Sequence, residues 1–232
     1  GLRVEAWKLA LEIDSEVCAF EAGRVEIEDS QPSVIKSIFA RHNIVWRIVM
    51  DENDGKITIR SSIENRGKKT VRLGQATLLQ TSEIEFGRRG DEVVVLPWKP
   101  GQHLQKVYRL GDAATPPLSK IKVQFYNRSA RHALQIGFLT FQRANTEVAF
   151  EATDEGLQSL RAHCDFAGWE LAPGASTETE AFRLSIGDNP YLQLEKWATE
   201  AGELVGAKIW DNAPIGYLGW SWVDPIRGES NY

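Results

Sequence analysis

The sequence predicts an all-β fold in which large antiparallel sheets pack face to face, followed by one helix. Apolar and polar residues alternate over 44–50, 57–63, 121–126 and 182–186, which is typical of strands with one buried and one solvated face. Turn-forming residues stand between such runs, as in the Asn-Asp-Gly triplet at 53–55. About a dozen or more strands at this spacing, with almost no helix between them, indicate a sandwich.

A single helix is predicted after the strands. Asn189 is suited to cap it, Pro190 to occupy its first position, and Gly206 to end it. The residues between them form an apolar stripe with helical spacing: Tyr191, Leu194, Trp197, Ala198, Ala201, Leu204 and Val205. We therefore expect a β domain over 1–187 and a linking helix with its connector over 188–213.

The segment GYLGWSWVD, at 216–224, predicts the start of a further domain. Pro214 and Pro225 bracket an apolar run that has the character of a short strand. Large aromatic side chains are rarely placed on a free tail, because a tail has nothing to bury them against. A strand that follows a helix is typical of the beginning of an α/β domain, so we assign 214–232 to one.

Composition and charge argue against several classes of protein. The chain has 232 residues, 42% of them hydrophobic and 25% charged, which is the balance of a globular protein with a substantial core. The net charge of −5 argues against a nucleic-acid partner. No apolar run approaches the roughly 18 residues of a membrane span, so we expect a soluble protein with no membrane partner. The first residue is Gly1, which suggests a processed or excised chain, and the cytoplasm is slightly favoured over export.

The sequence marks no catalytic centre of its own. The Gly-Lys-Lys-Thr run at 67–70 lacks the upstream glycines of a phosphate-binding loop and is interpreted as a hairpin turn. Nothing singles out two acidic residues as a catalytic pair. Cys18 and Cys164 either form one disulfide or are small buried hydrophobes. We expect no cofactor. We also expect no dedicated metal site, because the four histidines are not closely spaced with one another or with a cysteine: His42, His103, His132 and His163.

Tryptophans are the most distinctive residues. Each of the eight can be explained by packing in the core or in an interface. The periodicity of the sequence favours burial of Trp46 and Trp197. Trp169 is expected to be packed at the beginning of a strand. Trp98 differs, because it stands between prolines in LPWKPGQH, outside any alternating run. We expect it to be exposed at a loop tip, where an indole can stack on the apolar face of a sugar.

The order of these features resembles a known family. The segments SIENRGKKTVRL at 62–73, ALQIGFLTFQR at 133–143, the stretch from 168 to 202 and APIGYLGWSW at 213–222 are together similar to the N-terminal region of glycoside hydrolase family 36, which contains α-galactosidases. The resemblance implies a large, galactose-mutarotase-like β-supersandwich, a linking helix and then a (β/α)8 catalytic barrel. Gly219-Trp220-Ser221-Trp222 then corresponds to the first barrel strand.

The resemblance also implies where the chemistry lies. The two catalytic carboxylates of a retaining glycosidase would lie downstream in the barrel, so none of the residues of this chain is expected to be catalytic. Trp222 would line the sugar subsite, with Trp220 beside it and Trp98 as a contribution from the sandwich. The partners implied are an α-galactoside or related sugar, the chain's own barrel domain and, as an open question, a second copy in a homo-oligomer.

Three functions remain open. The first is a non-catalytic N-terminal domain of an exo-acting, α-galactosidase-like enzyme, which supports the barrel. The second is a stand-alone carbohydrate-binding β-sandwich, which would call for a planar row of exposed aromatics. The third is a structural or assembly module without a ligand.

Overall fold

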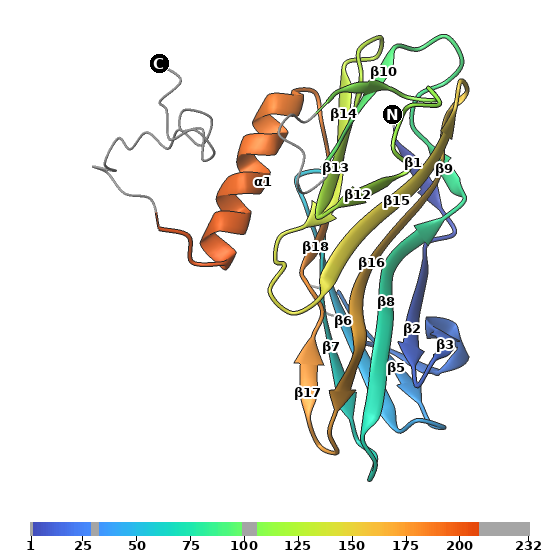
Figure 1. Ribbon diagram of the computed structural model, residues 1–232, viewed down its shortest axis with the longest axis vertical. Helices are drawn as coiled ribbons and strands as arrows, with labels where there is room; N and C mark the ends of the chain where they lie inside the picture. The colour runs from blue at the N-terminus through green and yellow to red at the C-terminus, as the bar shows by residue number, and fades with distance from the viewer. Residues whose placement is uncertain (1, 29–32, 99–105, 209–232) are drawn as a thin grey trace, which may run out of the picture.

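The computed structural model describes residues 2–28, 33–98 and 106–208, and in these the chain is an antiparallel β sandwich with one α-helix (Figure 1). A short 3-10 turn, Phe20–Ala22, follows β3. The strands are β1 Arg3–Glu5, β2 Lys8–Ile13, β3 Glu16–Ala19, β4 Arg24–Glu28, β5 Ser33–Phe39, β6 Ile44–Asn53, β7 Lys56–Asn65, β8 Val71–Thr81, β9 Glu83–Glu85, β10 Val93–Pro97, β11 Tyr108–Arg109, β12 Leu118–Lys120, β13 Lys122–Asn127, β14 His132–Phe138, β15 Asn145–Thr153, β16 Gly156–Leu171, β17 Ser176–Glu178 and β18 Phe182–Gly187.

Two large sheets make up the sandwich. The ten-stranded sheet has the order β11-β10-β13-β14-β18-β7-β6-β5-β4, with β17 paired to β7, and the six-stranded sheet has the order β12-β15-β16-β8-β2-β3. β1 and β9 form a small separate pair. The all-β, antiparallel class expected from the sequence is confirmed.

One hydrophobic core joins the two sheets. Phe125 of β13 meets Phe150 of β15 edge to face, with ring centroids 5.1 Å apart. Trp46 of β6 is fully buried, as predicted; it packs against Phe20, and its indole Nε1 donates to Ser61 Oγ at 3.0 Å. Buried aromatics of this size contribute strongly to stability because each removes a large apolar area from water.

Local sequence signals predicted the β6–β7 hairpin correctly. Asp54 and Gly55 both adopt positive φ, 50° and 69°, which is the geometry of the tight turns that suit the strand twist. The strand expected at 121–126 begins one residue later, at Lys122. Ile121 has a φ of 62° and stands where the chain passes from β12 of the six-stranded sheet to β13 of the ten-stranded sheet.

The helix α1, Pro190–Leu204, begins and ends where the sequence predicts. Asn189 accepts from the backbone N–H groups of Tyr191 and Leu192 at 3.0 and 3.1 Å, and Gly206 follows the helix with a φ of 67°. Much of the predicted apolar stripe is nevertheless not buried, since Tyr191 is 78% exposed. The helix lies on β14 and β18 of the ten-stranded sheet (Figure 1), and that surface is largely polar.

Polar contacts hold α1 on the sheet. Trp197 is half-buried rather than buried, and its Nε1 donates to the carbonyl of Phe138 at 3.2 Å. The ammonium of Lys122 lies 5.3 Å from the centroid of the Trp197 ring, within cation–π range. Arg183, only 2% exposed, is ion-paired with Glu200 of the helix. Among the described residues no helix is long and apolar enough to cross a membrane.

Candidate functional site

The six-stranded sheet carries a polar outer face, on the side of the sandwich away from α1. Along β16, Leu160, Ala162, Cys164 and Phe166 are buried in the core. The residues between them, Ser159, Arg161, His163 and Asp165, must point to the opposite side because successive side chains of a strand alternate. We call this side of the sheet the polar face.

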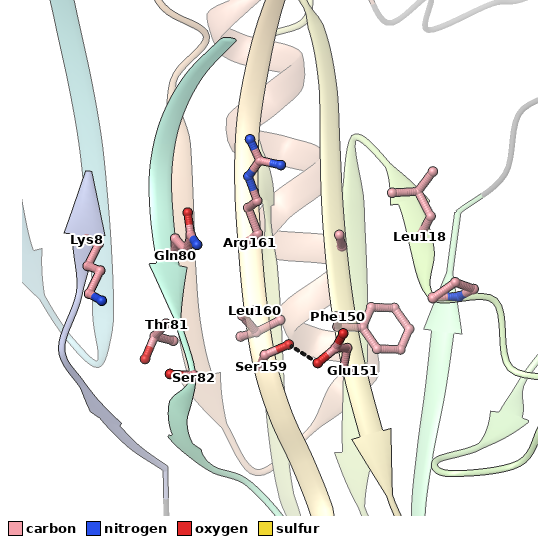
Figure 2. A pocket seen from close by; sticks show the side chains of 12 residues that line it. Lys8, Gln80, Thr81, Ser82, Leu118, Phe150, Glu151, Ser159, Leu160 and Arg161 are labelled. Atoms are coloured by element: carbon pink, nitrogen blue, oxygen red, sulfur yellow. Dashed lines mark hydrogen bonds between the residues drawn. The ribbon is translucent and has the colours of Figure 1, made fainter. Parts of the chain in front are cut away.

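An open groove of about 430 Å³ lies on the polar face. Its main polar residues come from neighbouring strands, because the strand register places Lys8 opposite Gln80, and Gln80 opposite Arg161. The same row continues to Ala149 and Leu118. Figure 2 shows the Lys8, Gln80 and Arg161 side chains arranged across adjacent strands. The small Ala149 side chain leaves room beside Arg161.

Arg161 and Glu151, which line the groove, each form a hydrogen bond with a neighbouring side chain. The guanidinium of Arg161 donates to Gln75 Oε1 at 2.6 Å, while its buried Nε–H has no hydrogen-bond partner. Glu151 accepts from Ser159 Oγ at 3.1 Å (Figure 2). Glu151 is also the only carboxylate that lines the groove in the described part of the chain. A single carboxylate with two cations suits the binding of hydroxyl or anionic groups, whereas glycoside hydrolysis requires a carboxylate pair.

A second row of charged groups runs beside the groove. Lys120, Glu147 and His163 stand opposite one another in the register. The Lys120 ammonium is ion-paired with Glu147, whose other oxygen lies 3.9 Å from His163 Nε2. Burial lowers the pKa of His163, and Arg161 adds to this effect. The imidazole is therefore neutral at pH 7, and its Nδ1 has no hydrogen-bond partner.

Trp98 does not stand at an exposed loop tip. It follows β10 directly and is half-buried. Its backbone N–H donates to Ser119 Oγ at 2.6 Å, and its carbonyl accepts from the N–H of Lys120 at 2.8 Å. These bonds fasten the end of β10, in the ten-stranded sheet, to β12, in the six-stranded sheet. The expected exposure was wrong because this strand-end pairing cannot be recognised from the local sequence.

The other predicted aromatics have different outcomes. Trp220 and Trp222 lie outside the described residues, so their sugar-binding role stays a prediction, as does the domain assigned to 214–232. Trp169, expected to be packed, is 50% exposed. It stacks on Phe166, with ring centroids 6.3 Å apart, next to a break in the β8–β16 register.

The groove residues are not among those predicted from the sequence, although a signal for them is present. Polar residues occupy every second position from Ser159 to Asp165, which predicts a polar sheet face but not which strands meet on it. The pairing of Lys8 with Gln80 and Arg161 joins segments that are distant along the chain. A three-residue cluster able to bind a metal lies elsewhere in the described structure, at Glu16, Cys18 and His42.

Comparisons with known proteins give structural likenesses only. A scan against protein-family models gave no match, and a search of the curated proteins gave none either. The chain is similar to the α-galactosidase from Lactobacillus brevis, with a TM-score of 0.49 and 12% identity over 87% of this chain and 29% of that one. It is also similar to a family 36 α-galactosidase from Geobacillus stearothermophilus in complex with stachyose, with a TM-score of 0.49 and 14% identity over 87% of this chain and 30% of that one.

A third likeness is to a candidate aldose 1-epimerase from Klebsiella pneumoniae, with a TM-score of 0.44 and 11% identity over 88% of this chain and 67% of that one. The chain thus spans less than a third of the length of the two galactosidases, 29% and 30%.

Proposed function

We propose that the chain is the non-catalytic N-terminal β-supersandwich of an exo-acting, α-galactosidase-like glycoside hydrolase. One observation carries this proposal. The sandwich passes from its last strand, β18, directly into α1, and the sequence then reaches Gly219-Trp220-Ser221-Trp222. The sandwich, the helix and the Gly-Trp-Ser-Trp segment, which we propose to be the first barrel strand, follow one another in the order that the sequence resemblance implies.

The role proposed for α1 is to fix the direction in which the chain leaves the sandwich. Glu200 of the helix pairs with both Arg183 of β18 and Lys56 of β7, the latter at 2.9 Å. Gln124 of β13 donates to the carbonyl of Pro190 at 2.7 Å, which anchors the first turn. A helix held at several points along its length can orient the domain that follows it. In this account the sandwich supports the barrel, and Trp98, Trp220 and Trp222 are the side chains proposed to face the sugar.

The coding sequence beyond Tyr232 tests this proposal. We expect seven further strand–helix units, which complete an eight-stranded barrel, with an aspartate at the end of each of two strands. A stop codon directly after Tyr232, or a continuation without that alternating pattern, would contradict the proposal.

The groove on the polar face favours a second candidate function, a stand-alone carbohydrate-binding sandwich. Sugar hydroxyls are both donors and acceptors, so they can bond to the cationic groups of Lys8 and Arg161, to the amide of Gln80 and to the carboxylate of Glu151. The groove is open to solvent, whereas enclosure of most of a ligand's surface is the feature that gives high affinity. Weak binding is therefore expected of the isolated chain.

Calorimetric titration with galactose and an α-galactosyl oligosaccharide separates the two functions. The supporting-domain proposal predicts dissociation constants of about a millimolar or weaker. Micromolar binding that is lost in Lys8→Ala and Gln80→Ala, but kept in Lys68→Ala, would make the carbohydrate-binding module the better account. Lys68 is a suitable control because it is exposed in the turn after β7, away from the groove.

A further inference from the structure

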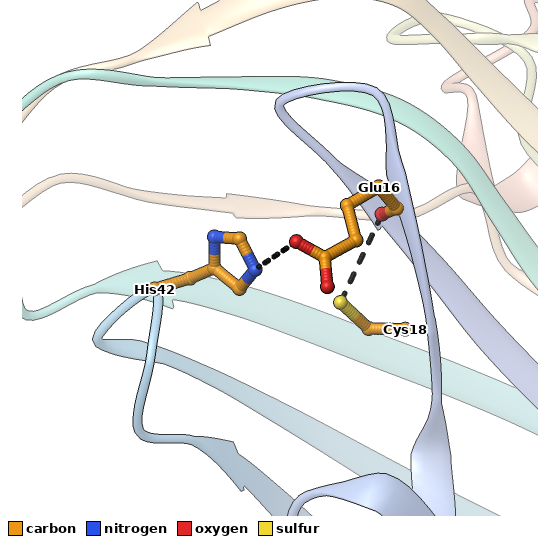
Figure 3. Close-up of side chains that lie close together, drawn as sticks. All are labelled: Glu16, Cys18 and His42. Atoms are coloured by element: carbon orange, nitrogen blue, oxygen red, sulfur yellow. Dashed lines mark hydrogen bonds and ion pairs between the residues drawn. The ribbon is translucent and has the colours of Figure 1, made fainter.

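Glu16, Cys18 and His42 meet at one end of the sandwich. Glu16 and Cys18 are two residues apart on β3, so their side chains share one face of that strand. His42 lies in the turn between β5 and β6. Figure 3 shows its imidazole pointing toward the Glu16 carboxylate, with the Cys18 thiol on the other side of that carboxylate. This cluster cannot be predicted from the local sequence, because Cys18 and His42 come together only through the folding of the two sheets.

The distances in the cluster suit a small divalent cation. One ligand atom from each residue lies within 4.8 Å of the others, and His42 Nε2 is 3.4 Å from Glu16 Oε2. Tetrahedral zinc has bonds of about 2.0–2.3 Å to nitrogen, oxygen and sulfur, which places its ligand atoms roughly 3.3–3.8 Å apart. Small side-chain rotations would therefore bring the three atoms to those separations.

The state of His42 points to a ligand as well. Its side chain is only 12% exposed, and its buried Nε2 makes no hydrogen bond: the nearby Glu16 Oε2, at 3.4 Å, is an ion-pair partner only of the protonated imidazole. A buried polar atom that makes no hydrogen bond is costly to the fold. Coordination of a cation by this nitrogen would satisfy it. Cys18 is a free thiol, so its sulfur can coordinate a metal.

We propose that Glu16, Cys18 and His42 form a binding site for one zinc ion. Thiolate sulfur, imidazole nitrogen and carboxylate oxygen are the ligands that zinc takes in proteins, and three protein ligands leave a fourth position for water. The Cys18 thiol loses its proton to solvent when the metal binds, so thiolate and carboxylate together balance the charge of the ion. Arg41 occupies only Glu16 Oε1, at 2.6 Å, which leaves Oε2 for the metal.

Such a site would connect the two sheets. β3 is an edge strand of the six-stranded sheet, whereas β5 and β6 belong to the ten-stranded sheet. A zinc ion held by β3 and the β5–β6 turn would therefore tie the sheets together at this end of the sandwich. Because the unfolded chain does not bring these residues together, zinc should stabilise the folded state by mass action.

Metal titration of the reduced 232-residue chain, after removal of metal with a chelator, tests the proposal. We expect one zinc ion per chain in competition with a chromophoric chelator, and a rise of a few degrees in the thermal midpoint. Cobalt, which replaces zinc and absorbs visibly, should give a sulfur-to-cobalt charge-transfer band. Cys18→Ser should remove that band. Both Cys18→Ser and His42→Gln should weaken zinc binding by more than about tenfold, because even the loss of a residue that only hydrogen-bonds to a metal ligand lowers metal affinity by about 10–100-fold.

The controls are His132→Gln, at the start of β14, and Cys164→Ala, in the core. Both should keep the zinc affinity and the cobalt band. Circular dichroism shows whether each variant is folded. If one of the two ligand variants does not fold, the other still tests the site. The proposal is overturned if the folded chain takes up no zinc at about 100 μM, or if zinc binds equally well in Cys18→Ser and His42→Gln.

Discussion

Burial controls the protonation of single residues on the polar face. His163 is 5% exposed and has Arg161 on its own strand, and both factors disfavour the imidazolium. Glu147 and Asp165 act in the opposite direction, and Lys120 adds to the lowering, but desolvation has the largest effect, so the pKa of His163 lies below its ordinary value. A charged histidine would have to be solvated or paired, and this site provides neither fully.

This lowered pKa predicts a loss of stability on acidification. As pH falls through about 6.5, the ordinary value, the unfolded chain takes up a proton at His163 before the folded chain does. The unfolded state then binds more protons than the folded state, so the free energy of unfolding decreases as pH drops. The contribution of His163 to this decrease ends once the imidazole of the folded chain is protonated as well. In His163→Gln the decrease should be smaller.

Urea unfolding between about pH 7.5 and 5.5 measures this difference. The wild-type chain should lose more stability over that interval than His163→Gln does. Parallel pH profiles for the two proteins would show that the burial of His163 does not disfavour its charged form.

At the scale of single residues, the sequence predicted burial well only where the alternation was unbroken. Trp46 lies within such a run and is fully buried. Trp98 and Trp169 lie at strand ends or irregular pairings, where long-range backbone bonds and register breaks determine exposure. The Cys18–His42 approach was not predictable either, since it depends on how β3 and the β5–β6 turn are brought together across the two sheets.

At the scale of elements, α1 shows what local signals determine and what they do not. Its cap, its first proline and the glycine after it are local features, and the helix has the predicted bounds. Its buried face is determined by the sheet beneath, where Gln135 and Arg183 are buried polar residues. The helix therefore docks through the polar Gln193 and Glu200 together with Trp197 and Ala201, which are only part of the predicted apolar stripe.

This docking mode predicts that Glu200→Gln is destabilising. The substitution leaves Arg183 buried without a counter-charge, and burial already lowers the pKa of this guanidinium. Breaking a fully buried pair costs about 3–5 kcal/mol. We expect about 1–3 kcal/mol here, because the Glu200 side chain is 36% exposed and water screens part of the interaction.

The matched control is Glu203→Gln on the same helix, where the side chain is exposed. It should change the free energy of unfolding by less than about 0.5 kcal/mol. Denaturant unfolding compares the two variants. Equal stabilities would mean that the Arg183–Glu200 pair does not anchor the helix.

At the scale of the whole molecule, the sandwich has two different outer sides. A single core spans both large sheets, so the β domain is one folding unit whose outer faces are available for other roles. One side holds α1 and leads toward the segment proposed to open the barrel. The other is the polar face with its groove. We propose that the first side faces the catalytic domain.

Hydrolysis of an aryl α-galactoside tests this account most directly. The 232-residue chain should release no nitrophenol from nitrophenyl α-galactoside, because general acid–base catalysis requires positioned groups that we place downstream. The longer product of the same reading frame, purified in parallel, should hydrolyse it with retention of configuration at the anomeric carbon. Turnover by the 232-residue chain that persists through repurification, or a longer product with no glycosidase activity, would contradict the account.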